Sequence, residues 1–418
     1  MRLSWRTELT VRRRLLVLTS TYPRWQNDRE PGFVHELCKR LTGDFDVTVL
    51  SPHASGAMVG EIMDGVSVRR YRYAPASWET LVNDGGIVTN LKRQPWKWLL
   101  VPGFLFVQAW VAWRLIRRWR PDIIHAHWVL PQGLLITVLS YIVRSKFPFL
   151  VTAHGADLFA LHGWRFTALK RFVIHRATAV TVVSSAMRTE LVRIGAEVDK
   201  VEIQPMGVDL SERFTPDPLI LRSPDEVLFV GRLVEKKGLR YLIGAMPAIL
   251  SARPETYLTV AGFGPEEPAL RMQVQELGLD NKVHFIGAVV QADLPALYRR
   301  AAVFVAPFVQ AASGDQEGLG LVCIEATGCG CPVIISDLAT SRDMFADASG
   351  VVSVTQADSS ALALAVQNVL LAPDRYRRAA IANRQQLMQQ FDWCAVSRRY
   401  IQLLQRLPAA SRVSHDSI

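Results

Sequence analysis

The sequence predicts an α/β protein of two domains, each a parallel β-sheet covered by helices. Three observations support this prediction: the length of the chain, its apolar content, and a regular alternation of strand-like and helix-like stretches. With 418 residues, the chain is too long for one compact core. Half of the residues are hydrophobic, which excludes a disordered chain. Alternating strands and helices make consecutive strands parallel and place helices on the faces of the sheet.

Ten short apolar runs rich in β-branched residues are the predicted strands. They cover residues 15–18, 47–50, 123–124, 149–152, 179–183, 227–230, 257–260, 283–285, 303–305 and 333–335. Helix-like stretches of mixed character follow them, for example at 33–41, 186–194, 239–250 and 294–300.

The alternation stops at a Pro- and Asp-rich stretch, 207–218, and resumes with a strand at Glu226. We therefore predict two Rossmann-like domains, 1–208 and 209–390. Residues 391–418 are expected to form an amphipathic helix that packs back on the first domain, followed by a tail. Ligands of open parallel sheets bind beyond the carboxyl ends of the strands, so two facing domains place the active site in the cleft between them.

The charge of the chain is uneven. Residues 1–210 hold 28 Lys and Arg against 17 Asp and Glu, whereas residues 211–418 hold 20 against 21. The first half therefore favours an anionic partner, either nucleic acid or the headgroup surface of a membrane. The alternative is a basic surface without a partner. Because the sequence contains no nucleic-acid-binding module, we expect no nucleic-acid partner.

Residues 98–113 form a run of 16 uncharged residues, shorter than the roughly 20 that span a bilayer. Tryptophans and basic residues are interspersed over the surrounding stretch 92–120. This composition is typical of a segment that lies in a membrane interface, so we predict contact with an anionic membrane surface. The alternative is a buried core helix. Pro102-Gly103 are expected to break the run near its start.

The cysteines and the N-terminal region indicate a reducing compartment. Five cysteines without a C-x-x-C pair form neither a disulfide framework nor a paired zinc site. The apolar run 15–20 is too short for the h-region of a signal peptide. We therefore expect a cytoplasmic protein that is peripheral to the inner face of the cytoplasmic membrane.

The densest motif is 316–326, QEGLGLVCIEA, which follows a predicted strand and opens a helix. Glycines at a helix start let backbone N–H groups approach a phosphate, and the helix dipole favours the same negative charge. Glu317 and Glu325 bracket these amides and, at the rise of a helix, lie about 12 Å apart. This spacing suits the two ends of a sugar-nucleotide, with one acid on the sugar and one on the ribose. The alternative is an ordinary helix with a solvated glutamate at each end.

Two further motifs follow strand ends. In 229–238 the strand ends at Gly231, Arg232 follows at once, and Lys237 precedes a glycine that opens a helix. Fixed cations at these positions would offset the charge that develops on a diphosphate leaving group. His154 comes directly after a strand of the first domain, so it points into the cleft, where it can bond to a reacting sugar. An isolated histidine is more often structural, but its position favours function.

In this order and spacing, the motifs resemble those of the retaining glycosyltransferases of family 4, which have the GT-B fold of two facing Rossmann-like domains. The resemblance covers nearly the whole chain, from Gly32 through 122–127, 205–209 and 262–265 to the two glutamates. It implies a hexosyltransferase that moves a sugar from a UDP- or GDP-sugar to a hydroxyl of a glycan or lipid-linked acceptor. The configuration of the sugar would be retained, in the synthesis of cell-surface polysaccharide or lipopolysaccharide.

The same resemblance implies roles for individual residues. Glu317 would contact the donor sugar and Glu325 the ribose. Arg232 and Lys237 would hold the diphosphate, and His154 would line the reacting face. No metal and no cofactor would be required, because basic residues and helix amides take the place of a metal on the diphosphate. The implied donor-binding residues are Gly32, Gly231, Gly318, Leu319, Gly320, Leu321 and Glu325.

The sequence departs from the family pattern in the loop after the first strand. That loop carries Pro31-Gly32 instead of adjacent glycines, which weakens the case for phosphate contact there. Residues 310–316 exceed a minimal loop and are expected to shape donor selection.

Three other patterns are interpreted as structural. Gly262-x-Gly264 is expected to be a turn near the nucleotide, because Pro265 and a missing third glycine spoil a dinucleotide fingerprint. His125 and His127 lie on one strand face without an evident third ligand, which favours packing over metal binding. Residues 44–46, which have the form D-x-D, precede the second strand and are expected to form a turn.

Two other functions fit the same fold. A GT-B sugar-nucleotide epimerase or phosphorylase would use carboxylates or histidines in the cleft. A non-catalytic subunit would bind glycan or nucleotide only, and the intact set of Glu317, Glu325, Arg232 and Lys237 argues against it.

Overall fold

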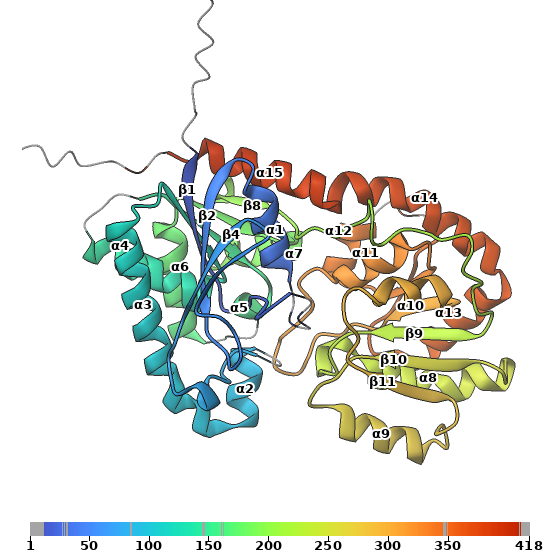
Figure 1. Ribbon diagram of the computed structural model, residues 1–418. Helices are drawn as coiled ribbons and strands as arrows, with labels where there is room; N and C mark the ends of the chain where they lie inside the picture. Colours follow the sequence, from blue (N-terminus) through green and yellow to red (C-terminus); the bar gives the residue numbers. More distant parts are fainter. Residues whose placement is uncertain are drawn as a thin grey trace, which may run out of the picture.

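The computed structural model describes residues 12–410, except for 27, 29, 31, 84–85, 144–146, 160, 162, 346–347, 349 and 409. Pro31 of the loop after the first strand and the tail beyond residue 410 therefore lie outside the described residues. The chain folds into two lobes that lie side by side, with two long helices running along one edge of both (Figure 1).

The N-terminal lobe is built on an eight-stranded sheet in the order β3-β4-β2-β1-β5-β6-β7-β8. All neighbouring strands are parallel except β3 and β4, which form an antiparallel pair. The strands are β1 (Arg13–Leu18), β2 (Phe45–Pro52), β3 (Gly60–Met63), β4 (Val66–Tyr71), β5 (Ile123–His127), β6 (Phe149–Ala153), β7 (Ala179–Val182) and β8 (Val201–Ile203). The α-helices are α1 (Phe33–Leu41), α2 (Ile87–Arg93), α3 (Leu100–Arg118), α4 (Leu134–Ile142), α5 (Ala156–Phe159), α6 (Trp164–Arg176) and α7 (Ser185–Arg193). Short helical turns are η1 (Ala76–Trp78), η2 (Pro95–Leu99), η3 (Val129–Gly133) and η4 (Val198–Lys200).

The C-terminal lobe is built on a six-stranded parallel sheet in the order β11-β10-β9-β12-β13-β14. Its strands are β9 (Glu226–Val230), β10 (Tyr257–Ala261), β11 (Val283–Gly287), β12 (Val303–Ala306), β13 (Val333–Ser336) and β14 (Val352–Val354). Its helices are η5 (Glu235–Lys237), α8 (Leu239–Ala252), α9 (Glu267–Glu276), α10 (Leu294–Arg300), α11 (Leu321–Gly328), α12 (Ala339–Phe345), α13 (Ser359–Leu371) and α14 (Pro373–Phe391). A last helix, α15 (Trp393–Arg406), follows.

The predicted fold class is confirmed, and each of the ten predicted strands is present. Their continuous apolar runs are explained by burial on both faces; Leu15 to Leu18 in β1, for example, are fully buried. The strands that the sequence analysis missed are β3, β4, β8 and β14. They are short or polar strands that lie at or next to a sheet edge, so burial selects their side chains less strongly.

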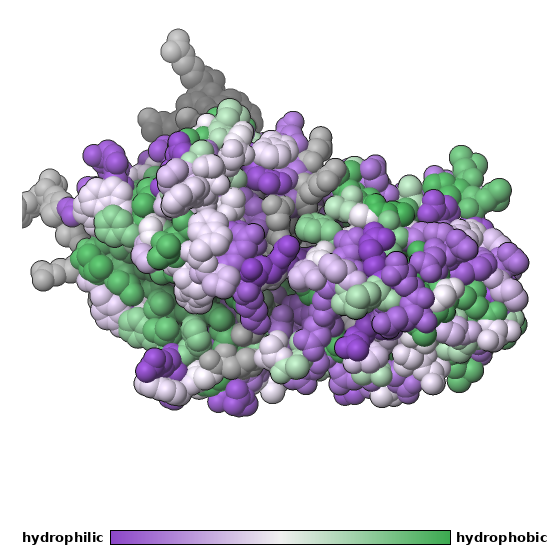
Figure 2. Space-filling model, turned by 90° about the horizontal axis from the view of Figure 1, so that it is seen from below, coloured by the Kyte–Doolittle hydropathy of each residue, from purple (hydrophilic) through white to green (hydrophobic). Residues whose placement is uncertain are grey.

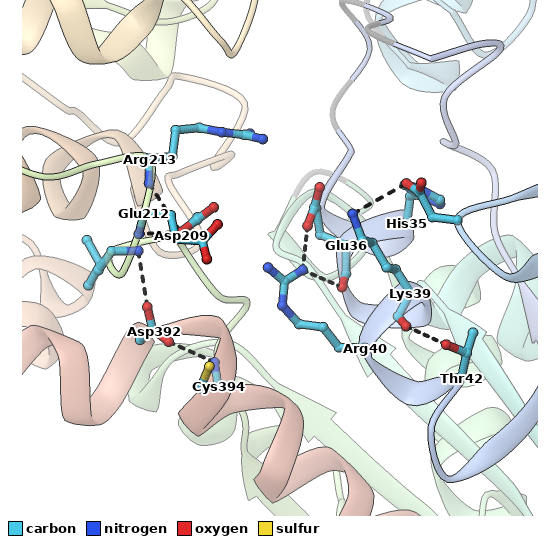
Figure 3. A network of polar contacts seen from close by, with 12 residues as sticks. His35, Glu36, Lys39, Arg40, Thr42, Asp209, Glu212, Arg213, Asp392 and Cys394 are labelled. Atoms are coloured by element: carbon cyan, nitrogen blue, oxygen red, sulfur yellow. Dashed lines mark hydrogen bonds and ion pairs between the residues drawn. The ribbon is translucent and has the colours of Figure 1, made fainter.

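The connection between the lobes has no helix or strand over 207–218, but it is packed rather than exposed. Leu210 and Phe214 are buried, and the carboxylate of Asp392 accepts hydrogen bonds from the Leu210 N–H (3.1 Å) and the Ser211 hydroxyl (2.9 Å). Asp392 also accepts a bond from the Cys394 N–H at 2.8 Å, at the start of α15. Figure 3 shows this cluster facing the Glu36–Arg40 ion pair on α1.

Helix α15 packs on the N-terminal lobe, whereas α14 packs on α11 of the C-terminal lobe. The Arg40 guanidinium lies 5.0 Å from the centroid of the Trp393 ring, and Tyr400 is fully buried. A second contact between the lobes is made by Asp343 of α12, which accepts bonds from the N–H and hydroxyl of Ser185, both at 2.6 Å, at the start of α7.

The apolar run 98–113 covers the last two residues of η2 and most of α3, a helix with two different faces. Pro102-Gly103 do not break it, contrary to the prediction, because Pro102 lies in the first turn, where proline is tolerated. A side chain at position 103 would come within 2.8 Å of the Tyr73 carbonyl oxygen. By length and composition, the described stretch Pro95–Arg118 could cross a membrane, because an 18-residue window within it has a mean hydropathy of 1.6. One face of α3 packs into the lobe and includes Leu100, Phe104, Gln108, Ala112, Leu115 and Ile116.

Candidate active site

Loops at the carboxyl ends of the two sheets meet between the lobes. His154 and Gly155 follow β6 of the N-terminal lobe, and Glu317 and Gly318 lie in the loop that follows β12 of the C-terminal lobe. A side chain at position 318 would lie 2.7 Å from the His154 carbonyl oxygen, and one at 155 would lie 3.2 Å from the Gly318 Cα. Glycine at both positions therefore permits the two loops to touch, which brings His154 next to the Glu317 loop.

Glu317 and Lys237 form an ion pair within the C-terminal lobe. Lys237 Nζ lies 2.8 Å from Glu317 Oε2 and 4.6 Å from the centroid of the Phe308 ring. Burial would raise the pKa of Glu317, but the ammonium groups of Lys237 and Lys236 outweigh it and lower this pKa to about 2. Glu317 is therefore an anion at neutral pH, which accepts hydrogen bonds from hydroxyl groups and does not act as an acid.

Arg232 follows Gly231 at the end of β9 and lies where charges from both lobes reach it. Burial lowers the pKa of Arg232, while Glu30 of the N-terminal lobe and Asp315 raise it and Arg93 of α2 lowers it further. The guanidinium and the Lys237 ammonium both follow β9, so the structure supplies two cations from the same strand end. Such a pair suits a phosphate or diphosphate.

The glycine-rich loop ends in a helix start, as its sequence predicts. Gly320 has φ of +80° and precedes the first residue of α11, Leu321. The Gly320 N–H contributes to the lowered pKa of the Glu317 carboxylate. Leu319 is buried, so its side chain anchors the loop in the core while the backbone amides are held at the helix start.

Glu325 has a different setting from Glu317. It lies inside α11 and is 6% exposed, and its carboxylate accepts bonds from Gln291 Nε2 and the Tyr298 hydroxyl, each at 3.0 Å. Burial raises the pKa of Glu325 to about 7. Because Glu317 lies before the helix, the separation of about 12 Å expected from helical rise does not apply to this pair. The contact of Glu325 with a ribose stays a prediction.

His154 sits in a group of aromatic rings. Its ring centroid lies 5.0 Å from Phe33 at the start of α1 and 4.9 Å from Trp128. Its Nε2 lies 2.9 Å from Nδ1 of His127. Burial lowers the pKa of His154 to about 3, so its ring is neutral at pH 7.

His125 and His127 lie on the same face of β5, with ring centroids 4.1 Å apart. His125 Nε2 lies 2.7 Å from the Thr152 hydroxyl, and both histidines are fully buried. Within the described part of the chain, no group of three or more His, Cys, Asp or Glu residues is placed to hold a metal ion.

Three further side chains of the site were not predicted from the sequence. Phe33 and Trp128 pack against His154, and Asp157 joins the segment after β5, which carries Trp128, to the segment after β6, which carries His154. The Asp157 carboxylate accepts bonds from the Val129 N–H (2.7 Å) and from the N–H groups of His154 (3.1 Å) and Gly155 (3.2 Å). Trp128 follows β5 just as His154 follows β6, so the shared sheet edge was a usable signal.

Two glycines have clear places near the cleft. Gly32 precedes α1, where an added Cβ would find its nearest neighbour, Pro23, at 3.8 Å, so space alone does not require glycine there. Gly262 does need glycine, because a Cβ would lie 1.8 Å from the Gly231 carbonyl oxygen. The 262–264 turn thus packs directly under the strand end that carries Arg232.

Two facing parallel-sheet lobes, with cations and a glycine-rich helix start converging between them, define a GT-B glycosyltransferase. The family model described as Glycosyltransferase Family 4 matches residues 33–212, and the model described as Glycosyl transferases group 1 matches residues 212–386. The chain belongs to glycosyltransferase family 4, and its donor is a nucleotide-sugar.

Curated relatives carry the same kind of activity in their names. A GDP-mannose-dependent α-(1-6)-phosphatidylinositol monomannoside mannosyltransferase of Mycolicibacterium smegmatis is 30% identical over 267 residues, covering 60% of this chain and 69% of the relative. A glycogen synthase of Mycobacterium tuberculosis is 28% identical over 403 residues and covers 92% of both chains.

Solved structures share the fold over nearly the whole chain. Sucrose-phosphate synthase from Thermosynechococcus elongatus superposes with a TM-score of 0.76 at 21% identity, covering 94% of this chain and 99% of that one. HepE from Anabaena in complex with UDP-glucose superposes with a TM-score of 0.69 at 16% identity, with the same coverage.

Proposed function

We propose that this protein is a retaining, metal-independent hexosyltransferase that moves a sugar from a UDP- or GDP-sugar to a hydroxyl of a glycan or lipid-linked acceptor. The reaction would serve cell-surface polysaccharide or lipopolysaccharide synthesis at the inner face of the cytoplasmic membrane. The observation that carries the proposal is the Lys237–Glu317 ion pair at the meeting point of the lobes, with Arg232 in the same segment after β9. In this proposal, a charged donor binds between the lobes and meets two cations and one carboxylate there.

The proposed mechanism assigns the two charges of the pair to different parts of the donor. Arg232 and Lys237 stabilise the negative charge that grows on the diphosphate as its bond to the anomeric carbon breaks. Glu317 accepts hydrogen bonds from the sugar hydroxyls and stabilises positive charge on the ring. The acceptor oxygen then bonds to the same carbon on the face that the diphosphate leaves, which retains the configuration.

The proton of the acceptor hydroxyl needs a base. Glu317, with a pKa of about 2, and His154, with a pKa of about 3, are both weak bases at neutral pH. The departing diphosphate oxygen is a stronger base than either group, so in this proposal the proton goes to the leaving group.

The outer face of the N-terminal lobe supports a location at a membrane. The exposed side of α3 joins exposed side chains of α4 and α6, and Figure 2 shows a broad hydrophobic area on this lobe. The large exposed apolar residues of this face are Trp98, Leu99, Leu105, Phe106, Trp110, Val138, Tyr141, Ile142, Trp164, Phe166, Leu169 and Phe172. We name these residues the apolar face. Because the other side of α3 packs into the lobe, this helix lies along the surface.

The charge around the apolar face suits anionic lipid. Residues 86–189 contain 14 Lys and Arg but only two Asp, Asp122 and Asp157. Asp157 is buried and bonded to backbone N–H groups, so it offers no negative charge to a partner surface. Two copies of this face would repel each other, whereas anionic headgroups would attract its cations and the membrane interface would accommodate its tryptophans.

Product analysis with a panel of nucleotide-sugars tests the proposed reaction. Purified protein is mixed with UDP- and GDP-sugars, with and without candidate acceptors, and released nucleoside diphosphate is measured in buffer that contains a chelator. Release without loss of rate in the chelator, and a product whose anomeric configuration matches the donor by NMR, support the proposal. A free altered sugar-nucleotide would show an epimerase instead, sugar 1-phosphate a phosphorylase, and binding without turnover a non-catalytic subunit.

A further inference from the structure

The bond between His127 and His154 has the geometry of an in-plane hydrogen bond. The two ring planes differ by 14°, and their centroids lie 5.1 Å apart. The Nδ1–Nε2 distance is 2.9 Å, and the centroid separation is close to this distance plus the two ring radii. The rings therefore lie edge to edge in nearly one plane, with the lone pair of one nitrogen aimed at the N–H of the other.

The direction of this bond follows from the other nitrogen of His127. Burial lowers the pKa of His127 well below its usual value and that of His154 to about 3, so each ring is neutral and carries one N–H. His127 Nε2 is buried, and no described residue forms a hydrogen bond with it. An orphaned buried N–H is rarer than an orphaned acceptor, so the proton of His127 belongs on Nδ1.

The tautomer of His154 is then fixed as well. Because His127 Nδ1–H donates to His154 Nε2, that nitrogen carries no proton, and the single N–H of His154 is at Nδ1. A neutral ring whose Nε2 already accepts a hydrogen bond can form a hydrogen bond with a ligand only through its Nδ1–H. His154 is thus a hydrogen-bond donor, suited to an oxygen that carries or gains negative charge.

We propose that His127 is a positioning residue that holds His154 in its Nδ1–H tautomer and in the plane required to donate to the substrate. This inference rests on the proposed function for the identity of the substrate, but the tautomer itself is independent of it. His127 lies on β5, the strand next to β6, which His154 follows. In this proposal it acts through His154 and does not touch the substrate.

His125 provides a matched comparison on the same strand. His125 is fully buried like His127, and the centroids of the two rings lie 4.1 Å apart. However, His125 forms its hydrogen bond with Thr152 and not with His154. Loss of either imidazole removes a similar volume from the core. Only the loss of His127 removes the donor to His154.

The decisive measurement is nitrogen-15 NMR of the wild-type protein labelled at histidine, with His154 assigned by its loss in His154→Gln. We expect the Nδ1 of His154 to be protonated and its Nε2 to be unprotonated. Protonation at Nε2 would overturn the proposal. This readout needs no activity, so it separates failure of the tautomer inference from failure of the proposed transferase function.

Kinetics of three variants test the consequence for the reaction. His127→Leu removes the donor, and kcat is expected to fall roughly 100-fold while KM changes little. His127→Asn keeps an N–H near the position of Nδ1 and is expected to restore most of kcat. His125→Leu is expected to change kcat by less than roughly threefold. Equal losses in His127→Leu and His125→Leu, with no rescue by Asn, would show a packing role only; should His127→Leu not fold, the Asn variant and the NMR readout still decide.

Discussion

The two lobes share one architecture but present different surfaces to their surroundings. The outer helices α3, α4 and α6 of the N-terminal lobe contain no Asp or Glu and expose many aromatic side chains. On the C-terminal lobe, α9 carries an Arg271–Glu267 pair at 2.8 Å, and the exposed large hydrophobic residues there include no Trp or Tyr among the described side chains. Ten of the eleven tryptophans precede residue 210.

This contrast shows which side of each covering helix the fold constrains and which side is free to vary with function. Both sheets need an apolar stripe on the inner side of each covering helix, and both lobes supply it. The outer side is free, and the C-terminal lobe fills it with the charged pairs of an ordinary soluble surface. The N-terminal lobe fills it with apolar and basic residues. This difference fits the proposed function, in which the N-terminal lobe meets an acceptor at a membrane and the C-terminal lobe binds a water-soluble donor.

The largest expected effect is in the C-terminal lobe. Glu317→Gln keeps the shape of the side chain but removes its charge, and we expect kcat to fall about 1000-fold because the carboxylate stabilises charge in the transition state. Nucleoside diphosphate release measures it. Glu276→Gln, a change of an exposed glutamate on α9, is the control and is expected to be neutral. Wild-type turnover in Glu317→Gln would refute the role of this residue.

The pH dependence of stability tests the same lobe at Glu325. Burial raises the pKa of Glu325 from 4.5 in the unfolded chain to about 7 in the folded protein. The stabilising contribution of the protonated form is therefore fully present below pH 4.5 and is lost as the pH rises through 7. The difference amounts to about 3 kcal/mol. Denaturant unfolding of wild type and Glu325→Gln from pH 5 to 8 measures it, and parallel curves for the two proteins would contradict the assignment.

The smallest expected effect concerns the apolar face. Vesicles rich in anionic phospholipid are expected to retain the protein and salt to release it, because both basic and aromatic groups face the lipid. Phe106→Ser together with Trp110→Ser should weaken vesicle binding roughly 10-fold without loss of donor hydrolysis in solution. Met272→Ser with Leu371→Ser, exposed apolar residues of the C-terminal lobe, should leave binding unchanged. Indifference of the wild-type protein to anionic lipid would remove the membrane part of the proposal.

Sequence patterns predicted the buried part of the fold better than its edges. Val227 to Val230 and the other central strands are recognisable because burial on both faces demands an apolar run. The edge strands β3 and β14 are short and partly exposed, so their composition carries little signal. Pro102 misled the prediction because proline disrupts a helix only beyond its first turn.

The site was predictable where it depends on strand ends and not where it depends on side-chain direction. The positions of Arg232 and His154 after strands β9 and β6 follow from the alternation alone. The Lys237–Glu317 contact joins residues 80 positions apart and depends on how η5 packs against the glycine loop, which no local pattern encodes. The packing of Phe33 and Trp128 against His154 also depends on tertiary contacts that no local pattern encodes.

The placement of α15 has a consequence for how the enzyme is made. Trp393 and Tyr400 are buried in the N-terminal lobe, and the centroid of the Tyr400 ring lies 5.9 Å from that of the His125 ring. A ribosome makes this helix only after the entire C-terminal lobe has been synthesised. The N-terminal lobe of the nascent chain therefore cannot complete its core until α15 has been made. A chain truncated before Trp393 lacks the side chains that pack behind His125.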